Sequence, residues 1–325
     1  MNAMRKIGIL ILCTAWLSGC SSLSHRRIHS TANPPITLPN TPIVVCYPVN
    51  SFDKLVINGD MDVVLTSQDP GYSVTATGMP AQLNTLNISN TQNTLYVSQR
   101  GFNRRADGVP TQLVINLPDL HQLQYQGAGH LTANNLNSSA LVAKLNNQAE
   151  VNLNGKQIYL QQLIQSGRGP VTISGVDSNA LFIKSTSGSP IELTGTVNLR
   201  SLTYEGNGRL HVYWLNSPYL RVHSSGSNYI MLAGITTMLD AVVSGRNYLD
   251  AKHLHAQQAF VNTADNARAD VWIRQSLNAL ATGNSNIYYY HPAKIQGIYM
   301  HTSGSVMDMA GIDPNAVPVV SAIQY

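Results

Sequence analysis

Residues 151–173 read VNLNGKQIYLQQLIQSGRGPVTI, and this stretch contains one complete period of a repeat. It begins with the apolar residues Val151 and Leu153, separated by one polar residue, and an equivalent pair starts 20 residues later at Val171. Alternation of apolar and polar residues with a period of two predicts β-strands. The segment 166–169 before the second pair is rich in glycine, which adopts the backbone conformations that a sharp turn needs.

The same pattern recurs along most of the chain, in steps of 18 to 20 residues. Another apolar residue lies eight positions before each pair, so two or three short strands fill every period and leave no room for a helix. The pairs begin at Leu131, Val151, Val171, Ile191, Leu210, Ile230, Leu249, Ala269 and Ile287, with a tenth start at Val306. The preceding apolar residues are Leu123, Ala143, Leu163, Ile183, Leu202, Val222, Ala241, Val261, Ala279 and Ile298.

This repeat predicts an all-β fold, a parallel β-solenoid (β-helix-like) of about ten rungs of 19–20 residues. A repeat unit that cannot bury its own apolar residues must stack on its neighbours. At about 4.8 Å per rung, ten rungs form a rod on the order of 50 Å long. A β-sandwich is the alternative, but it predicts strands at less regular spacing.

Both ends of the predicted solenoid depart from the period. Residues 47–118 begin in register, with Leu55 eight positions before Val63, and then lose the repeat. We expect a first coil followed by an inserted hairpin there, with a further insertion at Phe102–Pro110. At the other end, Asp308 occupies an inward position, and Asp313-Pro314 and Pro318 follow, so we expect a C-terminal cap. Residues 47–325 then form a single domain.

The first 19 residues resemble a lipoprotein signal peptide. Arg5 and Lys6 precede the short apolar stretch 7–16, which is too short to span a bilayer comfortably. Leu17-Ser-Gly-Cys20 resembles a bacterial lipobox, in which cleavage before the cysteine leaves a thiol that carries acyl chains. The resemblance implies lipidation (palmitate) at Cys20 and a membrane partner; the alternative is an ordinary secretory signal with a chance cysteine. Residues 20–46 are Ser- and Pro-rich and predict a linker from the lipid to the fold.

Resemblance to lipoproteins also implies a location. Ser21 stands where an aspartate would hold a lipoprotein at the inner membrane, so we expect anchoring in the outer membrane, facing the periplasm or the cell surface. Cys13 leaves with the signal peptide and Cys20 carries lipid, so Cys46 has no internal disulfide partner. We expect Cys46 to be a lone half-buried thiol near the start of the fold; the alternative is a redox or dimerising thiol.

Charge is scarce in this chain. Charged residues make up 11% of it, against roughly 25% in an average soluble domain. The formal net charge is +4, and no Lys/Arg run exceeds two residues, which argues against a nucleic-acid partner. A stacked repeat explains the scarcity, because like charges in one column repel while Asn, Ser and Thr ladders hydrogen-bond.

Motifs for catalysis and cofactors are missing from the sequence. We find no HExxH, GxSxG, P-loop or complete GxGxxG motif, so no catalytic residue and no cofactor is expected. His253 and His255 would share one strand face, but no carboxylate or cysteine lies nearby at ligand spacing, and we interpret them as surface histidines.

The repeat does predict a candidate binding face. Residues just before and after the first member of each pair point outward, and in the later rungs they include aromatic and charged side chains. Tyr229 and Tyr248 would stack as a pair that packs against sugar rings, and Asp250 and Asp270 would lie about 5 Å apart, a weak metal candidate. The alternative is a solvated sheet face with ordinary cross-strand pairs. The candidate residues are Arg209, His211, Tyr229, Tyr248, Asp250, Arg268, Asp270 and Tyr288.

The segment FDKLVINGDMDVVL (residues 52–65), followed by VTATG (74–78) and the glycine-punctuated rungs, resembles the family of putative auto-transporter adhesins with a head GIN domain. The similarity covers roughly residues 50–310. This resemblance implies an all-β, solenoid-like envelope protein of bacteria, secreted or lipid-anchored, with no catalytic residues established for the family.

Three classes of function are compatible with these features. The first is a non-enzymatic, lipid-anchored envelope protein with an adhesin-like binding or structural role, whose partner is a glycan or protein of the envelope or of a host surface. The second is a polysaccharide lyase or hydrolase, for which Asp250, Asp270 and Arg268 are the only candidates. The third is a passive scaffold or stalk. The sequence does not determine the oligomeric state.

Overall fold

Nearly all of the repeat region is strand in the computed structural model, which describes residues 41–101, 109–291 and 293–313. The signal peptide, Cys20 and most of the linker lie outside these residues. The strands are β1 (Ile43–Tyr47), β2 (Lys54–Asn58), β3 (Asp62–Thr66), β4 (Ser73–Gly78), β5 (Leu86–Thr91), β6 (Thr94–Gln99), β7 (Gln112–Asn116), β8 (Gln122–Gly127), β9 (Leu131–Asn147), β10 (Val151–Gln165), β11 (Val171–Ser185), β12 (Ile191–Gly206), β13 (Arg209–Gly226), β14 (Tyr229–Val243), β15 (Tyr248–Thr263), β16 (Arg268–Ala281), β17 (Asn286–Tyr289), β18 (Lys294–Met300) and β19 (Ser305–Asp308). One short helix, α1 (Pro80–Leu83), lies between β4 and β5. Within the described residues, no helix is long and apolar enough to cross a membrane.

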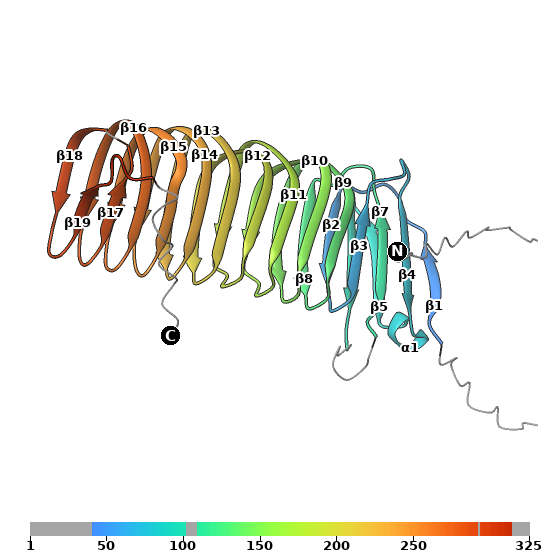
Figure 1. The fold of residues 1–325 in the computed structure, drawn as a ribbon. Helices are drawn as coiled ribbons and strands as arrows, with labels where there is room; N and C mark the ends of the chain where they lie inside the picture. Colours follow the sequence, from blue (N-terminus) through green and yellow to red (C-terminus); the bar gives the residue numbers. More distant parts are fainter. Residues whose placement is uncertain (1–40, 102–108, 292, 314–325) are drawn as a thin grey trace, which may run out of the picture. The chain divides into compact units, whose positions relative to one another are not determined.

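The predicted parallel β-solenoid is confirmed. From β8 onward, each turn hydrogen-bonds in parallel to the next, and the turns follow one another along the solenoid axis (Figure 1). The structure has about 9 turns of about 20 residues. The repeat count predicts about ten rungs, and the difference arises because ten starts enclose only nine complete periods.

The register confirms both predicted columns of apolar residues. Val151 pairs with Val171, and Leu249 pairs with Ala269, so equivalent residues lie directly above one another. The second column behaves in the same way, as the pairing of Leu163 with Ile183 shows. Members of both columns are at most 5% exposed from Leu123 to Ile287 and form one continuous core along the solenoid.

Each turn has three faces, which we name from β11. The first face contains the inward residues Val171 and Ile173, the second contains Val176, and the third contains Leu181 and Ile183. Polar side chains occupy the interior at the corner after the third face, where they hydrogen-bond to backbone carbonyls of the turn. For example, the Gln165 side-chain amide donates to the Gly169 carbonyl at 2.9 Å. The outward residues between these positions form the surface.

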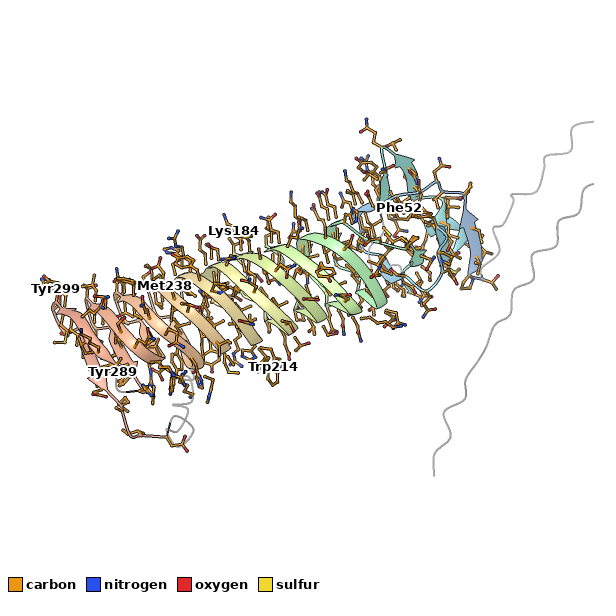
Figure 2. The ribbon with its side chains drawn as sticks, turned by 90° about the horizontal axis from the view of Figure 1, so that it is seen from above. Phe52, Lys184, Trp214, Met238, Tyr289 and Tyr299 are labelled. Atoms are coloured by element: carbon orange, nitrogen blue, oxygen red, sulfur yellow. The ribbon has the colours of Figure 1, made fainter. Side chains whose placement is uncertain are left out.

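Glycine is required at the corner between the first and second faces. Gly175 has a φ of +76°, and a Cβ there would lie 2.0 Å from the carbonyl oxygen of Gly155 in the preceding turn. Trp214 occupies a comparable corner of β13 with a φ of +61°, and its side chain is 76% exposed and projects from the solenoid (Figure 2). Corner geometry therefore admits a large residue only where its side chain can point into solvent.

The N-terminal end contains the predicted first coil and the predicted hairpin. β2 and β3 pair in register with β8 and β9, and β5 and β6 form the antiparallel hairpin. In addition, β6 and β7 form a further rung against the opposite edge of β2 and β3. Antiparallel β4 pairs with β7, and β1 pairs with β4, so these strands cover the edge that a parallel stack would leave open.

Two expectations for this end are wrong. Strand β1 begins at Ile43, so ordered structure starts within the segment 20–46 that predicts a linker. Cys46 is exposed rather than half-buried, because β1 lies at the margin of the sheet with little packed against it. Its Sγ is 3.9 Å from the Thr75 hydroxyl of β4.

The C-terminal end is more open. The last rung consists of β18, which pairs with β16, and β19, which pairs with β17. Ile298 belongs to the inward column but is 40% exposed, because no described turn stacks on it. Asp308, at an inward position of β19, is also exposed. Pro314 and Pro318, on which the predicted cap depends, lie outside the described residues.

Replacing Gly175 with alanine should destabilise the solenoid more than replacing Gly101. Both glycines have a φ of +76°, so both variants carry a backbone cost of about 1–2 kcal/mol. A Cβ at Gly101 meets no atom within 4 Å, whereas a Cβ at Gly175 overlaps the Gly155 carbonyl, which adds about 1–3 kcal/mol. Thermal and urea unfolding followed by circular dichroism measure the difference, and equal stability of Gly101→Ala and Gly175→Ala would contradict the corner argument.

Candidate binding surface

The structure brings all eight predicted surface residues together on the outer side of the first face. Arg209, Tyr229, Tyr248 and Arg268 occupy one column on successive turns. His211, Met231, Asp250, Asp270 and Tyr288 occupy the adjacent column. We call the eight predicted residues the tyrosine strip: Arg209, His211, Tyr229, Tyr248, Asp250, Arg268, Asp270 and Tyr288.

Asp270 is the most highly connected residue of the tyrosine strip. Arg268, two positions earlier on the same strand, binds it with Nε and Nη2, both at 2.7 Å. The Tyr248 hydroxyl donates to Oδ2 at 2.7 Å from the preceding turn, and the Tyr290 hydroxyl donates to the same oxygen at 3.5 Å. With these partners around it, Asp270 is only 1% exposed although it lies on an outward face.

Asp250 has a similar but less complete set of partners. The Tyr229 hydroxyl donates to Oδ2 at 3.0 Å, and Lys252 Nζ lies 3.5 Å from the same oxygen. Asp250 is 3% exposed and Lys252 is 8% exposed, so the ion pair is buried. Oδ1 of Asp250 is buried and has no hydrogen-bond partner.

Both carboxylates therefore have a cation from their own strand. Lys252 and Arg268 supply the positive charge that a metal ion would otherwise bring to Asp250 and Asp270. Among the residues that the structure describes, no three His, Cys, Asp or Glu side chains are grouped closely enough to hold a metal ion. In this structure Asp250 and Asp270 anchor the surface network through Lys252 and Arg268.

Burial and the carboxylates keep the tyrosines protonated. Burial raises the pKa of Tyr248, and the charge of Asp270 raises it further; burial and Asp250 act in the same way on Tyr229. Burial, followed by the charge of Asp270, raises the pKa of Tyr290 to about 12. Burial by itself would lower the pKa of Arg268, but the hydrogen bonds to Asp270 and the negative charge of Asp270 together raise it. The network remains composed of neutral hydroxyl donors and paired charges at physiological pH.

The rings of the strip meet edge to face. Tyr229 and Tyr248 have centroids 5.3 Å apart at an interplanar angle of 65°, so they do not form the flat stack that the sequence predicts. His211 packs against Tyr229 at 5.8 Å and 85°, and its Nε2 is buried without a partner. The Arg268 guanidinium lies between Tyr248 and Tyr288, 4.9 Å and 4.5 Å from their centroids.

Two members of this network were not predicted, Lys252 and Tyr290. Lys252 lies two residues after Asp250 on one strand, and the period of two places both on the same side; this spacing could have identified it. Tyr290 follows the last residue of β17, where the strand pattern no longer defines a side, so the sequence offers no comparable signal.

The corresponding positions of earlier turns contain mostly small polar residues. Thr132, Asn152, Thr172 and Glu192 align with His211 in successive turns. Aromatic rings on this side of the first face are thus concentrated in the later turns, β13 to β17.

Of the two predicted surface histidines, His253 and His255, only His255 forms part of an aromatic ladder on the second face. His255 is exposed and stacks on Trp272 with centroids 4.1 Å apart at 25°, and Trp272 contacts His291 at 4.4 Å. Burial, followed by the positive charge of Arg274, lowers the pKa of His255. Both faces of the Trp272 ring are covered by neighbours, so the ladder is structural.

A further polar cluster escaped the sequence analysis because its members come from three separate segments. His121 Nδ1 lies 3.1 Å from Asp53 Oδ2, and its Nε2 lies 3.0 Å from Asp119 Oδ2 and 2.9 Å from Ser139 Oγ. The composition resembles a Ser-His-Asp triad, but the Ser139 hydroxyl donates to Asp119. A carboxylate oxygen lies within 3.1 Å of each ring nitrogen, so His121 bridges two acids, and the Ser139 hydroxyl is directed at Asp119 rather than held for attack on a substrate.

Comparison with known proteins identifies relatives by family and by fold. The model of a family described as "Putative auto-transporter adhesin, head GIN domain" matches residues 51–218 and 183–293. No curated protein matches the chain.

Several solved structures match most of the chain at low sequence identity. They include a putative lipid binding protein from Parabacteroides distasonis, with 15% identity over 83% of this chain and 98% of that chain and a TM-score of 0.46. A putative adhesin from the same organism has 15% identity over 82% and 97% and a TM-score of 0.44. A putative adhesin from Bacteroides fragilis has 16% identity over 83% and 98% and a TM-score of 0.33.

Replacing Asp270 with asparagine should strongly destabilise the later turns. The change leaves Arg268 partly buried without its counter-charge, and removal of one partner from a buried ion pair costs about 3–5 kcal/mol. Asp240→Asn is the matched control, because Asp240 forms a 3.1 Å ion pair with Arg221, whose side chain is 61% exposed. Urea unfolding should show a large shift for Asp270→Asn and a small one for Asp240→Asn; similar shifts would refute the structural role of Asp270.

Proposed function

This chain belongs to the family of putative auto-transporter adhesins with a head GIN domain, and we propose that it is a non-enzymatic envelope protein with an adhesin-like role. In this proposal, lipid on Cys20 anchors it in the outer membrane, and the tyrosine strip binds a glycan or protein of the envelope or of a host surface.

The observation that carries the proposal is the preorganisation of the strip. Hydroxyl groups of Tyr229 and Tyr248 are held by buried carboxylates, and Arg268 is held between two rings. Side chains that are fixed before binding lose little conformational entropy when a partner arrives. Tyrosine and arginine are also the residues that most often dominate binding energy at interfaces.

The same contacts support a binding role over catalysis. Lyase or hydrolase chemistry needs carboxylates that reach the substrate, whereas Asp250 and Asp270 are buried and already bound by Lys252 and Arg268. Asp119, the acid beside His121, is likewise bound by Ser139. Burial opposes these hydrogen bonds, but they prevail and lower the pKa of Asp119, which makes it a poor general acid near neutral pH.

Support for the anchor comes from the sequence. The lipobox-like residues 17–20 are followed by a Ser- and Pro-rich segment that ends at β1. Several acyl chains on one cysteine hold a protein stably on a bilayer, whereas a single chain does not. A linker between lipid and β1 leaves the solenoid free to meet a partner.

Cys20→Ala should abolish lipidation and membrane attachment. Cells fed with labelled palmitate should incorporate label into the wild-type protein and none into the variant, which should move from the membrane fraction to the soluble fraction. Cys46→Ala is the control and should behave like the wild type. Loss of label in Cys46→Ala, or membrane retention of Cys20→Ala, would refute the anchor. Protease treatment of intact cells then separates a surface from a periplasmic orientation.

Combined replacement of Arg209, His211 and Tyr288 by alanine should weaken binding through the strip at least tenfold, because a loss of about 1.4 kcal/mol corresponds to that factor. These three side chains make none of the hydrogen bonds to Asp250 or Asp270 given above, so the fold should persist. The matched control is Asn152→Ala with Thr172→Ala, at equivalent positions of earlier turns. Purified protein on beads is assayed for adherence to cell-wall sacculi and to epithelial cells. Equal adherence of all three proteins would exclude the strip.

A further inference from the structure

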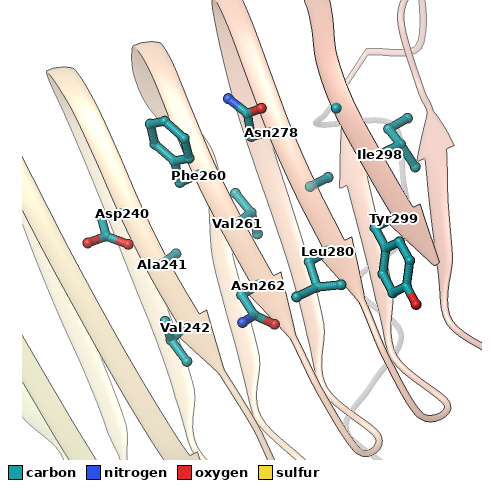
Figure 3. Close-up of a pocket in the computed structure, with 12 residues that line it drawn as sticks. Asp240, Ala241, Val242, Phe260, Val261, Asn262, Asn278, Leu280, Ile298 and Tyr299 are labelled. Atoms are coloured by element: carbon teal, nitrogen blue, oxygen red, sulfur yellow. The ribbon is translucent and has the colours of Figure 1, made fainter. Parts of the chain in front are cut away.

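A groove crosses the outer side of the third face in the last turns, away from the first face that bears the tyrosine strip. Its volume is about 410 Å³. One outward column, Asp240, Phe260, Asn278 and Gly297, runs along it, and a second column contains Val242, Asn262, Leu280 and Tyr299 (Figure 3). Tyr299 lies at the opposite end of the solenoid from Phe52 (Figure 2).

The groove exists because of a glycine in the last rung. Gly297 continues the column of Phe260 and Asn278 but has no side chain, so the surface is hollow beside Asn278. A Cβ at Gly297 would meet only the Asn278 Oδ1, at 3.4 Å, so the backbone does not require glycine there. The hollow is therefore a property of this residue choice rather than of the turn geometry.

Two aromatic rings flank the hollow and remain largely in solvent. Phe260 is 47% exposed and Tyr299 is 61% exposed. Between them lie the amides of Asn262 and Asn278. Among the described residues, the Asn262 side chain forms no hydrogen bond, and the one side-chain hydrogen bond of Asn278 is donated to Gln296 Oε1, at 3.2 Å. Exposed rings beside uncommitted amides have the composition of a small-molecule site, in which apolar walls supply area and a few polar groups orient the ligand.

Charge at the groove is already neutralised. Asp240 accepts hydrogen bonds from Arg221 Nε at 3.1 Å and from the Tyr219 hydroxyl at 2.9 Å. No other charged residue lines the groove among the described residues. A strongly anionic or cationic ligand would find no counter-charge here, so the geometry favours a neutral ligand.

We propose that this groove binds neutral oligosaccharides of N-acetylated hexosamines. The C–H face of a pyranose ring packs on Phe260 or Tyr299, while the acetamido group exchanges hydrogen bonds with Asn262 and Asn278. Val242 and Leu280, on the same column as Asn262, provide apolar contacts for the acetyl methyl group. The site goes beyond the proposed role of the tyrosine strip and uses a separate face.

Calorimetric titration of the full mature chain with chitohexaose and with cellohexaose tests the proposal. The two hexasaccharides share their linkage and differ in the acetamido group. Chitohexaose should bind at least tenfold more tightly. Cellohexaose has no acetamido group, so Asn262 and Asn278 would have no hydrogen-bond partner on that ligand. Absent binding of chitohexaose, or equal binding of the two sugars, would overturn the proposal.

Gly297→Phe should fill the hollow and reduce chitohexaose affinity at least tenfold, and Phe260→Ala should reduce it by removing one ring. Gly71→Phe is the control, because a Cβ there meets no atom within 4 Å and Gly71 lies outside the groove, and it should bind like the wild type. Circular dichroism verifies that each variant is folded. Unchanged affinity in folded Gly297→Phe would place any sugar binding elsewhere. Loss of affinity in the Arg209/His211/Tyr288 variant but not in Gly297→Phe would assign the sugar to the tyrosine strip instead.

Discussion

The parallel hydrogen-bond ladder between successive turns is the constraint on which the rest of this structure depends. Each residue lies one rung, about 4.8 Å, from its equivalents in the neighbouring turns. A side chain therefore packs mainly against copies of its own column, as Val151 does against Leu131 and Val171. The same stacking forces glycine at Gly175, because the carbonyl of the preceding turn occupies the space of a Cβ.

Stacking is a difficulty for charged residues, and the later turns show how it is resolved. Asp250 and Asp270 are neighbours in one column, where two carboxylates would repel each other. Each has a cation two residues away on its own strand, Lys252 after Asp250 and Arg268 before Asp270. The period of two places each cation beside its acid, so neutralisation occurs within a turn and the column can contain adjacent acids. Low overall charge is the simpler solution that the remaining turns adopt.

The sequence predicted the features that the ladder repeats and missed those that occur once. Both apolar columns and the assembly of the eight strip residues follow from a spacing of 18 to 20 residues, and the register confirms them. Burial of Asp270 was not predictable, because it depends on Tyr290 at the end of β17, outside any periodic position. The rung formed by β6 and β7 was missed for a related reason. It follows β2 and β3 in the chain, but it stacks on the side of them that faces away from β8 and β9. Asp53 meets His121, 68 residues later, only because residues inserted after β3 separate two turns that are adjacent in space.

The two ends of the solenoid differ in how their outermost strand edges are covered. This difference bears on which turns are accessible to a partner. At the N-terminal end, antiparallel strands β4, β5 and β1 cover the edge of the parallel stack, and β1 is the first strand after Cys20 in the sequence. At the other end, β18 has no described neighbour beyond it, and its residues are exposed from Lys294 to Met300. Aromatic side chains on the outer side of the first face gather in turns β13 to β17, toward that open end, whereas the equivalent positions Thr132, Asn152 and Thr172 of earlier turns are small and polar. Turns β13 to β17, which contain the tyrosine strip, lie along the solenoid away from β1 (Figure 1). If the proposed lipid on Cys20 anchors the chain, this arrangement places the proposed binding surface on the turns away from the anchored end.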